Sequence, residues 1–139
     1  MNVRVDPHSL TPPSQQLVAA VLDAIATGAL LPGDRLPSVR GLAASALVNP
    51  NTVAKAFRDL EHLGVTEGRN GSGVFVTAAG PDVATSLRLC STLAAFREAA
   101  ALALRAGHAV EVLALGLHEL TANRERELES QREREGSKA

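Results

Sequence analysis

Tryptophan and tyrosine are absent from this chain, and phenylalanine occurs only three times. Any folded core must therefore consist mainly of alanine, leucine and valine, and apolar residues do make up 45% of the sequence. The single cysteine, Cys90, excludes an internal disulfide. No apolar stretch approaches the ~20 residues that a transmembrane helix needs, and the N-terminus lacks the pattern of a signal peptide. We therefore expect a cytoplasmic protein with no membrane partner.

A basic surplus is also missing. The 139 residues carry a net charge of −1, and residues 1–80 contain six basic and six acidic side chains. Domains that bind nucleic acid through a general electrostatic field are usually strongly basic. If this chain binds DNA, a few well-placed cations must make the contacts to the phosphates. The length suits one domain or two small ones.

The residue patterns that support catalysis or metal binding are absent too. The four histidines are not spaced as metal ligands. His118-Glu119 begins like a zinc-binding helix, but no second histidine lies four residues after His118. Cys90 lies in an apolar helical row, which favours a structural thiol over a nucleophile. The segment from Gly68 to Gly73 lacks the lysine of a phosphate-binding loop. The sequence therefore predicts no enzyme, no metal and no cofactor.

Two helices are expected in residues 14–46. Ser14 can cap the first, whose apolar positions recur with a helical period up to Ile25, and Gly28 is well placed to end it. The loop from Leu31 to Pro37 contains two prolines and a glycine. Ser38 can then cap a short second helix ending near Ala46.

A third helix is predicted from Asn49 onward, because Asn49 suits the N-cap and Pro50 suits the first helical position. Its buried stripe is expected to contain Val53, Phe57 and Leu60, at i, i+4 and i+7. Gly64 would close the helix. The opposite side is polar and carries Asn51, Lys55, Arg58 and His62. Donors and acceptors on one side of a helix are suited to the major groove, where base edges present complementary groups.

A β-hairpin is predicted in residues 65–76, because two β-prone segments flank a turn containing Asn70-Gly71. A hairpin directly after a helix-turn-helix is typical of a wing. Arg69, near its tip, would reach phosphate or the minor groove, with Gly71 at the turn. The alternative is an ordinary surface hairpin.

Several motifs now agree in order: Leu31-Pro-Gly-Asp-Arg-Leu-Pro-Ser38, Arg40, Leu42-Ala43, Asn49-Pro-Asn-Thr-Val-Ala-Lys-Ala56, Leu60-Glu61, Gly64 and Phe75-Val76. Residues from about 14 to 77 resemble the winged helix-turn-helix domain of the GntR family of bacterial transcription regulators. The recognition-helix segment and the short C-terminal region are similar to the YtrA-like branch of that family.

The resemblance implies roles for individual residues. Arg40 matches an arginine that contacts DNA in the family, and the leading end of the recognition helix is matched by Asn49, Asn51 and Thr52. Ala54 stands where many relatives have arginine, and Lys55 is expected to substitute in part. Leu47 takes the place of the usual turn glycine, so we expect the turn to be rebuilt locally. The alternative for Arg40 is an ion pair with Glu61.

The pattern changes after Gly80-Pro81. Asp82 can cap a long helix to about Arg105, and a second helix follows the break at Ala106-Gly107. Two apolar rows on the first helix are more than one short partner helix can cover, which favours an intermolecular bundle over docking onto the chain's own winged domain. The residues predicted to form this dimer interface are Leu93, Phe96, Val110, Leu113, Leu117 and Leu120. Residues 124–138 are expected to be a frayed helix end or a disordered tail.

The predicted architecture is mainly α with a small β-hairpin wing. A winged helix-turn-helix domain (1–80) is followed by a two-helix dimerisation unit (81–123) and a charged tail (124–139). The predicted function is a homodimeric regulator, most simply a repressor, that binds an inverted-repeat operator in double-stranded DNA. One alternative is a winged-helix module for protein–protein contact. A second is a regulator that senses a small-molecule effector at the dimer interface.

Overall fold

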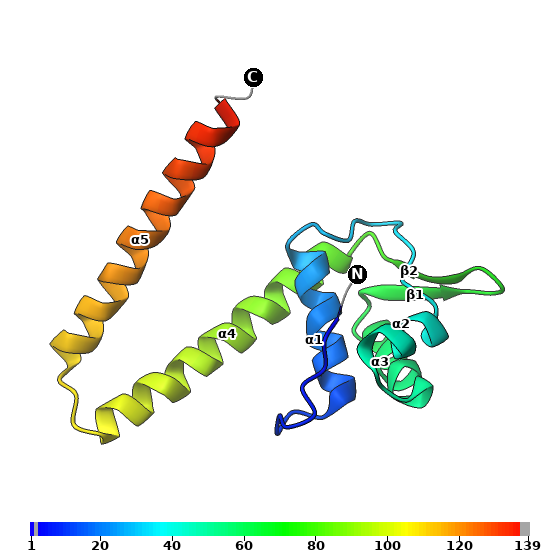
Figure 1. Ribbon diagram of the computed structural model, residues 1–139, viewed down its shortest axis with the longest axis horizontal. Coiled ribbons are helices and arrows are strands. Elements are labelled where there is room, and N and C mark those ends of the chain that lie inside the picture. The colour runs from blue at the N-terminus through cyan, green and yellow to red at the C-terminus, as the bar shows by residue number, and fades with distance from the viewer. Residues whose placement is uncertain (2, 137–139) are drawn as a thin grey trace. The chain divides into compact units, whose positions relative to one another are not determined.

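The computed structural model describes residue 1 and residues 3–136 of the chain. These residues form five helices and one two-stranded antiparallel sheet (Figure 1). The fold is therefore mainly helical with a small hairpin, as predicted. The chain divides into two compact units, Met1–Thr92 and Leu93–Ala139. Among the described residues, no helix is both long and apolar enough to cross a membrane.

Three helices form the core of the first unit: α1 (Pro13–Ala26), α2 (Val39–Ala46) and α3 (Pro50–His62). α1 and α2 both pack against α3. All three residues of the predicted α3 stripe, Val53, Phe57 and Leu60, are buried. Each apolar residue lies one helical turn from the next, so one side of α3 is fixed in the core while the other side faces out.

The helix ends follow most of the predicted signals. Ser38 caps α2 by accepting a hydrogen bond from the Gly41 amide, and Asn49 caps α3 by accepting one from Asn51. Gly28 and Gly64, just beyond α1 and α3, both have positive φ, a conformation that glycine adopts without steric cost. The predicted cap at Ser14 is wrong. Ser14 lies inside α1, which begins at Pro13 because proline needs no hydrogen-bond partner for its nitrogen at the first helical position.

The turn between α2 and α3 keeps the conformation that a glycine would favour. Leu47 has φ 55° and ψ 45°, in the left-handed region, and its amide donates to the Ala43 carbonyl. The expected local rebuilding of this turn is therefore wrong. Leu47 is 92% exposed, so its side chain gains almost no burial to offset the steric cost of the conformation.

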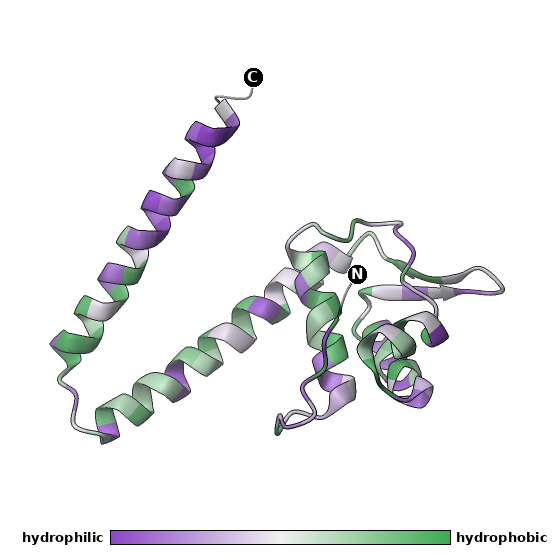
Figure 2. Ribbon diagram, viewed as in Figure 1, coloured by the Kyte–Doolittle hydropathy of each residue, from purple (hydrophilic) through white to green (hydrophobic). Residues whose placement is uncertain are grey.

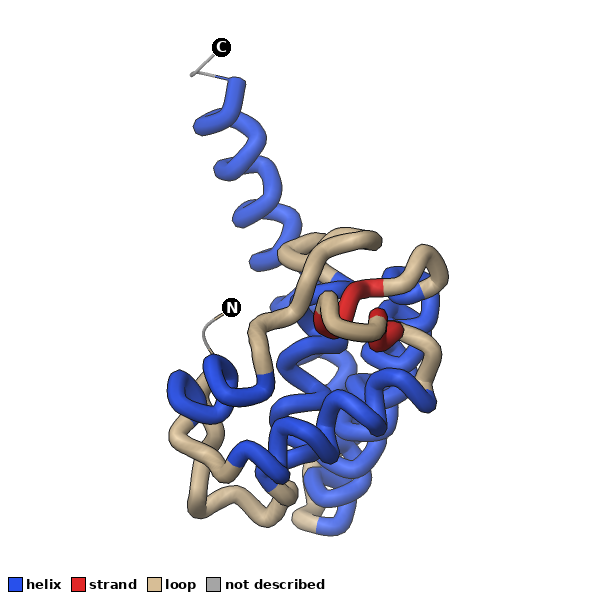
Figure 3. The backbone as a smooth tube through the Cα atoms, turned by 90° about the vertical axis from the view of Figure 1, so that its right-hand side faces the viewer, coloured by secondary structure: helices blue, strands red, loops and turns tan. Residues whose placement is uncertain are grey.

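The predicted hairpin consists of β1 (Thr66–Arg69) and β2 (Gly73–Val76), which are short beside the helices (Figure 3). Their register pairs Thr66 with Val76 and Arg69 with Gly73. The loop before α2 extends this sheet on the β2 side through three backbone hydrogen bonds. These are Gly33 N to Val76 O (2.9 Å), Leu36 N to Val74 O (2.8 Å) and Val76 N to Asp34 O (2.9 Å).

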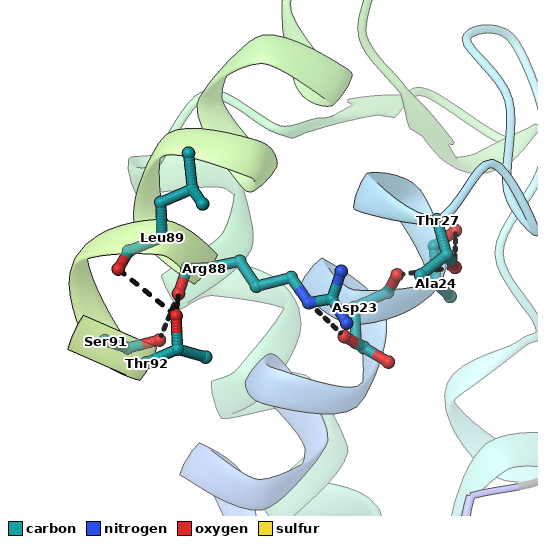
Figure 4. Close-up of polar contacts among 7 residues, drawn as sticks. All are labelled: Asp23, Ala24, Thr27, Arg88, Leu89, Ser91 and Thr92. Atoms are coloured by element: carbon teal, nitrogen blue, oxygen red, sulfur yellow. Dashed lines mark hydrogen bonds and ion pairs between the residues drawn. The ribbon is translucent and has the colours of Figure 1, made fainter. Parts of the chain in front are cut away.

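The first turns of α4 (Gly80–Arg105) belong to the same unit as the winged domain. Ala84 is fully buried in the core, and Gly80 lies so close to Val65 that an added Cβ would come within 3.0 Å of the Val65 carbonyl oxygen. The Arg88 guanidinium also forms a 2.8 Å ion pair with Asp23 on α1 (Figure 4). The division after Thr92 thus falls beyond the expected boundary at residue 80. Asp82 lies in the first turn of α4 and is not its cap.

The second unit contains the rest of α4 and all of α5 (Val110–Gly136). Figure 2 shows apolar residues concentrated in the first half of α5 and hydrophilic residues in its second half. The charged segment is helical as far as Gly136, so of the two predicted alternatives, a frayed helix end or a disordered tail, the disordered tail is wrong for residues 124–136. Residues 137–139 of that prediction lie outside the described part of the chain. No described residue of α5 is buried.

Leu47→Gly should stabilise the protein. A leucine in the left-handed region costs about 1–2 kcal/mol, and glycine removes this cost. The greater flexibility of glycine in the unfolded chain lowers the stability again by about 0.5–1 kcal/mol. We expect the free energy of unfolding, measured by urea denaturation, to rise by about 0.5–1 kcal/mol. Leu47→Ala is the matched control, because it retains the Cβ and should give no gain. Equal stabilisation by both variants would refute the strain at Leu47.

Phe57→Ala should destabilise the first unit severely. Phe57 is 6% exposed and is the largest side chain in the buried stripe of α3. Truncation of a buried phenylalanine costs about 3–5 kcal/mol, a large part of the stability of a small domain. Thermal melting followed by circular dichroism should show a large fall in Tm or no cooperative transition. A loss below about 1 kcal/mol would mean that α3 packs through a different face.

Candidate nucleic-acid interface

The exposed side of α3 presents its polar residues at the end nearest the turn. Asn49 and Asn51 are exposed, and Thr52 is partly exposed. The Asn49 side-chain oxygen accepts from the Asn51 amide at 2.8 Å, so the cap holds this end of the helix in one conformation. Helix N-termini also carry partial positive charge, which attracts anions such as phosphate. These three predicted residues therefore lie together on one accessible surface.

Arg40 is the second residue of α2 and is exposed. The Ser38 hydroxyl accepts from the Gly41 amide at 3.0 Å and fixes the start of the helix. The alternative ion pair with Glu61 is not formed in the described part of the chain, where Arg40 has no salt bridge. The Glu61 carboxylate lies instead beside Gly68 of β1, where an added Cβ would come within 2.8 Å of it. Among the described residues, the Arg40 guanidinium thus has no carboxylate at ion-pair distance.

Lys55 is exposed one turn further along α3, and its Nζ lies 2.8 Å from the Asp59 carboxylate. This pair links residues i and i+4 on one helix, and more than half of the Lys55 side chain is accessible to solvent. Such exposed pairs contribute only about 0.3–0.5 kcal/mol. The ammonium group can therefore be taken over by a phosphate, although Asp59 reduces its net charge.

The hairpin places Arg69 at the end of β1 and Gly71 in the turn, with φ +72°. The Arg69 guanidinium is engaged within the hairpin. Its Nη2 and Nε donate to the same Glu67 oxygen at 2.8 and 3.2 Å, and its Cζ lies 4.4 Å from the centre of the Phe75 ring. Arg69 is thus in the predicted place, with its charge partly neutralised by its neighbours.

Sequence reasoning did not select two further arginines of this unit. Arg4 is exposed and lines a hollow together with Leu47, Asn49 and Thr52, beside the N-terminal end of α3. Arg35 is exposed beside the hairpin, in the loop that extends the sheet. Their closeness to the interface depends on contacts across loops, so periodicity could not reveal it. In the sequence, Arg4 is marked only by its charge, and Arg35 by its charge and its place in the motif of residues 31–38.

The predicted dimerisation residues belong to the second unit, and most of them lie together. A hollow of about 570 Å³ between α4 and α5 is lined by Phe96, Val110, Leu113, Leu117 and Leu120, with alanines around them. Leu93 lies on α4, like Phe96, and is 49% exposed, but it does not line this hollow. Every residue lining the hollow is apolar, including Gly116.

Three helices followed by a hairpin, with a polar recognition helix and an exposed arginine at the start of the preceding helix, define a winged helix-turn-helix DNA-binding domain. Comparisons with known proteins agree. Residues 13–76 match the family model described as bacterial regulatory proteins, gntR family. Over 75 residues the chain is 40% identical to the HTH-type transcriptional repressor YtrA of Bacillus subtilis, an alignment that covers 54% of this chain and 58% of that protein.

Two solved structures extend the comparison. YtrA from Sulfolobus acidocaldarius, a GntR-family transcription factor, is 31% identical with a TM-score of 0.54, covering 68% of this chain and 99% of that one. The DNA-binding domain of AraR in complex with its operator ORX1 is 26% identical with a TM-score of 0.51, covering 55% and 99%. The chain therefore belongs to the GntR family of bacterial transcription regulators, in its YtrA-like branch. It spans less than two thirds of the length of the Bacillus protein.

Proposed function

We propose that this chain binds an inverted-repeat operator as a homodimer, with α3 of each protomer in the major groove of one half-site. The observation that carries the proposal is the division of α3 into two sides. Val53, Phe57 and Leu60 fix one side in the core, and the polar N-terminal end of the other side is accessible. A helix held in this way presents its side chains to base edges with little freedom to move.

Arg40 is the residue to which we assign the firmest DNA contact. It lies at the start of the helix that braces α3, and it is accessible and has no salt bridge in the described residues. Asn49, Asn51 and Thr52 supply donors and acceptors beside it. Lys55 contributes a second cation on α3, weakened by Asp59. The complex of the AraR DNA-binding domain with its operator supports the use of this domain on duplex DNA.

The homodimer is proposed to form through the hollow in the second unit. Its lining residues leave a continuous apolar surface, and residues such as Val110 and Leu120 are 64% and 67% exposed in the single chain. Exposed apolar surface of this kind usually marks an interface. A metabolite site normally contains a few polar groups that orient the ligand, and no polar side chain lines this hollow. These features support a second copy of the chain over a small-molecule effector as the occupant.

Repression by occluding a promoter is the simplest outcome of such binding, and the similar Bacillus protein is named a transcriptional repressor. We place the protein in the bacterial cytoplasm, where its DNA would be. The alternative function, a winged-helix module for protein–protein contact, is favoured only by the neutral charge of residues 1–80. The accessible polar end of α3 favours DNA, as does Arg40, which has no salt bridge in the described part of the chain.

Selection of duplexes from a random DNA library by the purified protein tests the proposal directly. We expect an enriched inverted repeat whose binding weakens steeply as salt rises, because phosphate contacts release counterions. A protein-interaction module would enrich no sequence and would bind duplex DNA weakly at every salt concentration.

Arg40→Ala should weaken binding to the selected operator with little effect on thermal stability, because the side chain is exposed. Loss of a bidentate contact to guanine costs about 1–3 kcal/mol per half-site and relaxes the preference at one base position. Lys55→Ala should cost less, because Asp59 already offsets the lysine charge. Fluorescence anisotropy measures both effects. Arg58→Ala, exposed further along α3, is the matched control and should bind nearly as well as the wild type. Wild-type affinity in Arg40→Ala would remove Arg40 from the interface.

Leu117→Glu should convert the dimer to a monomer without unfolding it, because Leu117 is already 50% exposed within the single chain. A charge buried in an apolar interface without a partner is strongly unfavourable. Operator affinity should then fall about 100-fold, since the second half-site no longer binds at high effective concentration. Sedimentation velocity and anisotropy measure the two effects. Leu115→Glu, on the same helix but outside the hollow, is the control and should remain dimeric. A dimeric Leu117→Glu protein would place the interface elsewhere.

A further inference from the structure

The outer face of the hairpin carries five residues: Glu67, Arg69, Gly73, Phe75 and Arg35. Glu67 pairs with Phe75 in the register and Arg69 pairs with Gly73, so the alternation of the strands puts these four positions on one face. The residues of alternate parity, Thr66 and Val76, are buried on the other face. The fifth member, Arg35, comes from the loop beside β2 and forms an isolated bridge with Phe75. Any duplex that touches this face meets two arginines and one glutamate.

The two arginines differ in what holds them. Arg69 shares one Glu67 oxygen between its Nε and Nη2 and lies over the Phe75 ring, so the arginine and the glutamate together carry no net charge. A phosphate that binds Arg69 must first displace Glu67 and leave that carboxylate close to another negative group. Like charges at such short separation repel, which reduces the benefit of the contact.

Arg35 is held without a carboxylate. Backbone hydrogen bonds of its neighbours Asp34 and Leu36 to β2 fix the main chain. Its side chain lies across Gly73, where an added Cβ would come within 2.7 Å of Nε and 3.3 Å of Cζ. The missing side chain at Gly73 is therefore what leaves room for the guanidinium. Arg35 is exposed, and no acidic group pairs with it in the described residues.

We propose that Arg35, and not Arg69, supplies the main phosphate contact of the wing. The inference rests on the proposed DNA-binding function and adds to it the residue through which the hairpin contributes affinity. The guanidinium comes from the flank of the hairpin and not from its tip, which suits the sugar-phosphate backbone at the edge of a groove. The contact is therefore independent of base sequence.

The test measures binding of the full chain to the selected operator and to a scrambled duplex between about 50 and 200 mM salt. Each phosphate contact contributes about 0.9 to the slope of log affinity against log salt. Arg35→Gln should flatten the slope by about that amount per protomer, and equally on both duplexes. Arg69→Gln should change it by less than half as much. Arg35→Lys should retain most of the wild-type slope, because lysine keeps the positive charge.

Two further variants sharpen the comparison. Arg124→Gln removes one positive charge from α5, outside the winged domain, and should leave the slope unchanged, which controls for net charge. Glu67→Gln should release Arg69 and steepen the slope, and adding Arg69→Gln should abolish that gain. Thermal melts of each variant check the fold. A melt lowered equally in Arg35→Gln and Arg35→Lys, with the slope lost only in Arg35→Gln, would still support the contact.

The results separate this inference from the function on which it rests. Wild-type protein with no salt-dependent binding to either duplex would overturn both. Wild-type binding together with an unchanged slope in Arg35→Gln would overturn the Arg35 assignment alone. A slope flattened as much by Arg69→Gln as by Arg35→Gln would also overturn that assignment and leave the DNA-binding function standing.

Discussion

Burial of one side of α3 is the constraint on which the rest of the structure depends. Val53, Phe57 and Leu60 hold this helix against α1 and α2. The sequence contains no tryptophan or tyrosine that could add buried surface to this contact. Because the stripe is fixed in the core, the opposite side must face outward. The Asn49 cap fixes the N-terminal end of the helix. The recognition surface is thus a consequence of core packing, and a rigid surface is what reading of base edges requires.

The local charge arrangement accounts for how a domain of zero net charge can present cations to DNA. Carboxylates are placed against particular cations: Asp59 against Lys55, Glu67 against Arg69 and Asp23 against Arg88. Arg4, Arg35 and Arg40 are exposed and take part in none of these pairs. The summed charge of residues 1–80 therefore understates the positive surface available to phosphate. Formal charge is a poor guide when opposite charges are distributed unevenly.

Much of this fold can be predicted from the sequence because its signals are local. The caps at Ser38 and Asn49, the glycines after α1 and α3, and the turn of the hairpin each depend on a few neighbouring residues. Prediction fails where tertiary contacts override local preference. Leu47 accepts a strained conformation because α2 and α3 are both anchored in the core, and α4 begins before Asp82 because Gly80 and Ala84 pack on the winged domain. Likewise, no periodicity indicates that Glu67 holds Arg69 or that Arg35 lies across Gly73.

The central claim is that two copies of α3 read two halves of one operator. Hydroxyl-radical footprinting of the selected duplex, on both strands, tests it most directly. We expect two protected regions related by a two-fold axis, with centres about one helical turn, or a multiple of it, apart. A single protected region without symmetry, at protein concentrations that saturate the operator, would contradict the claim.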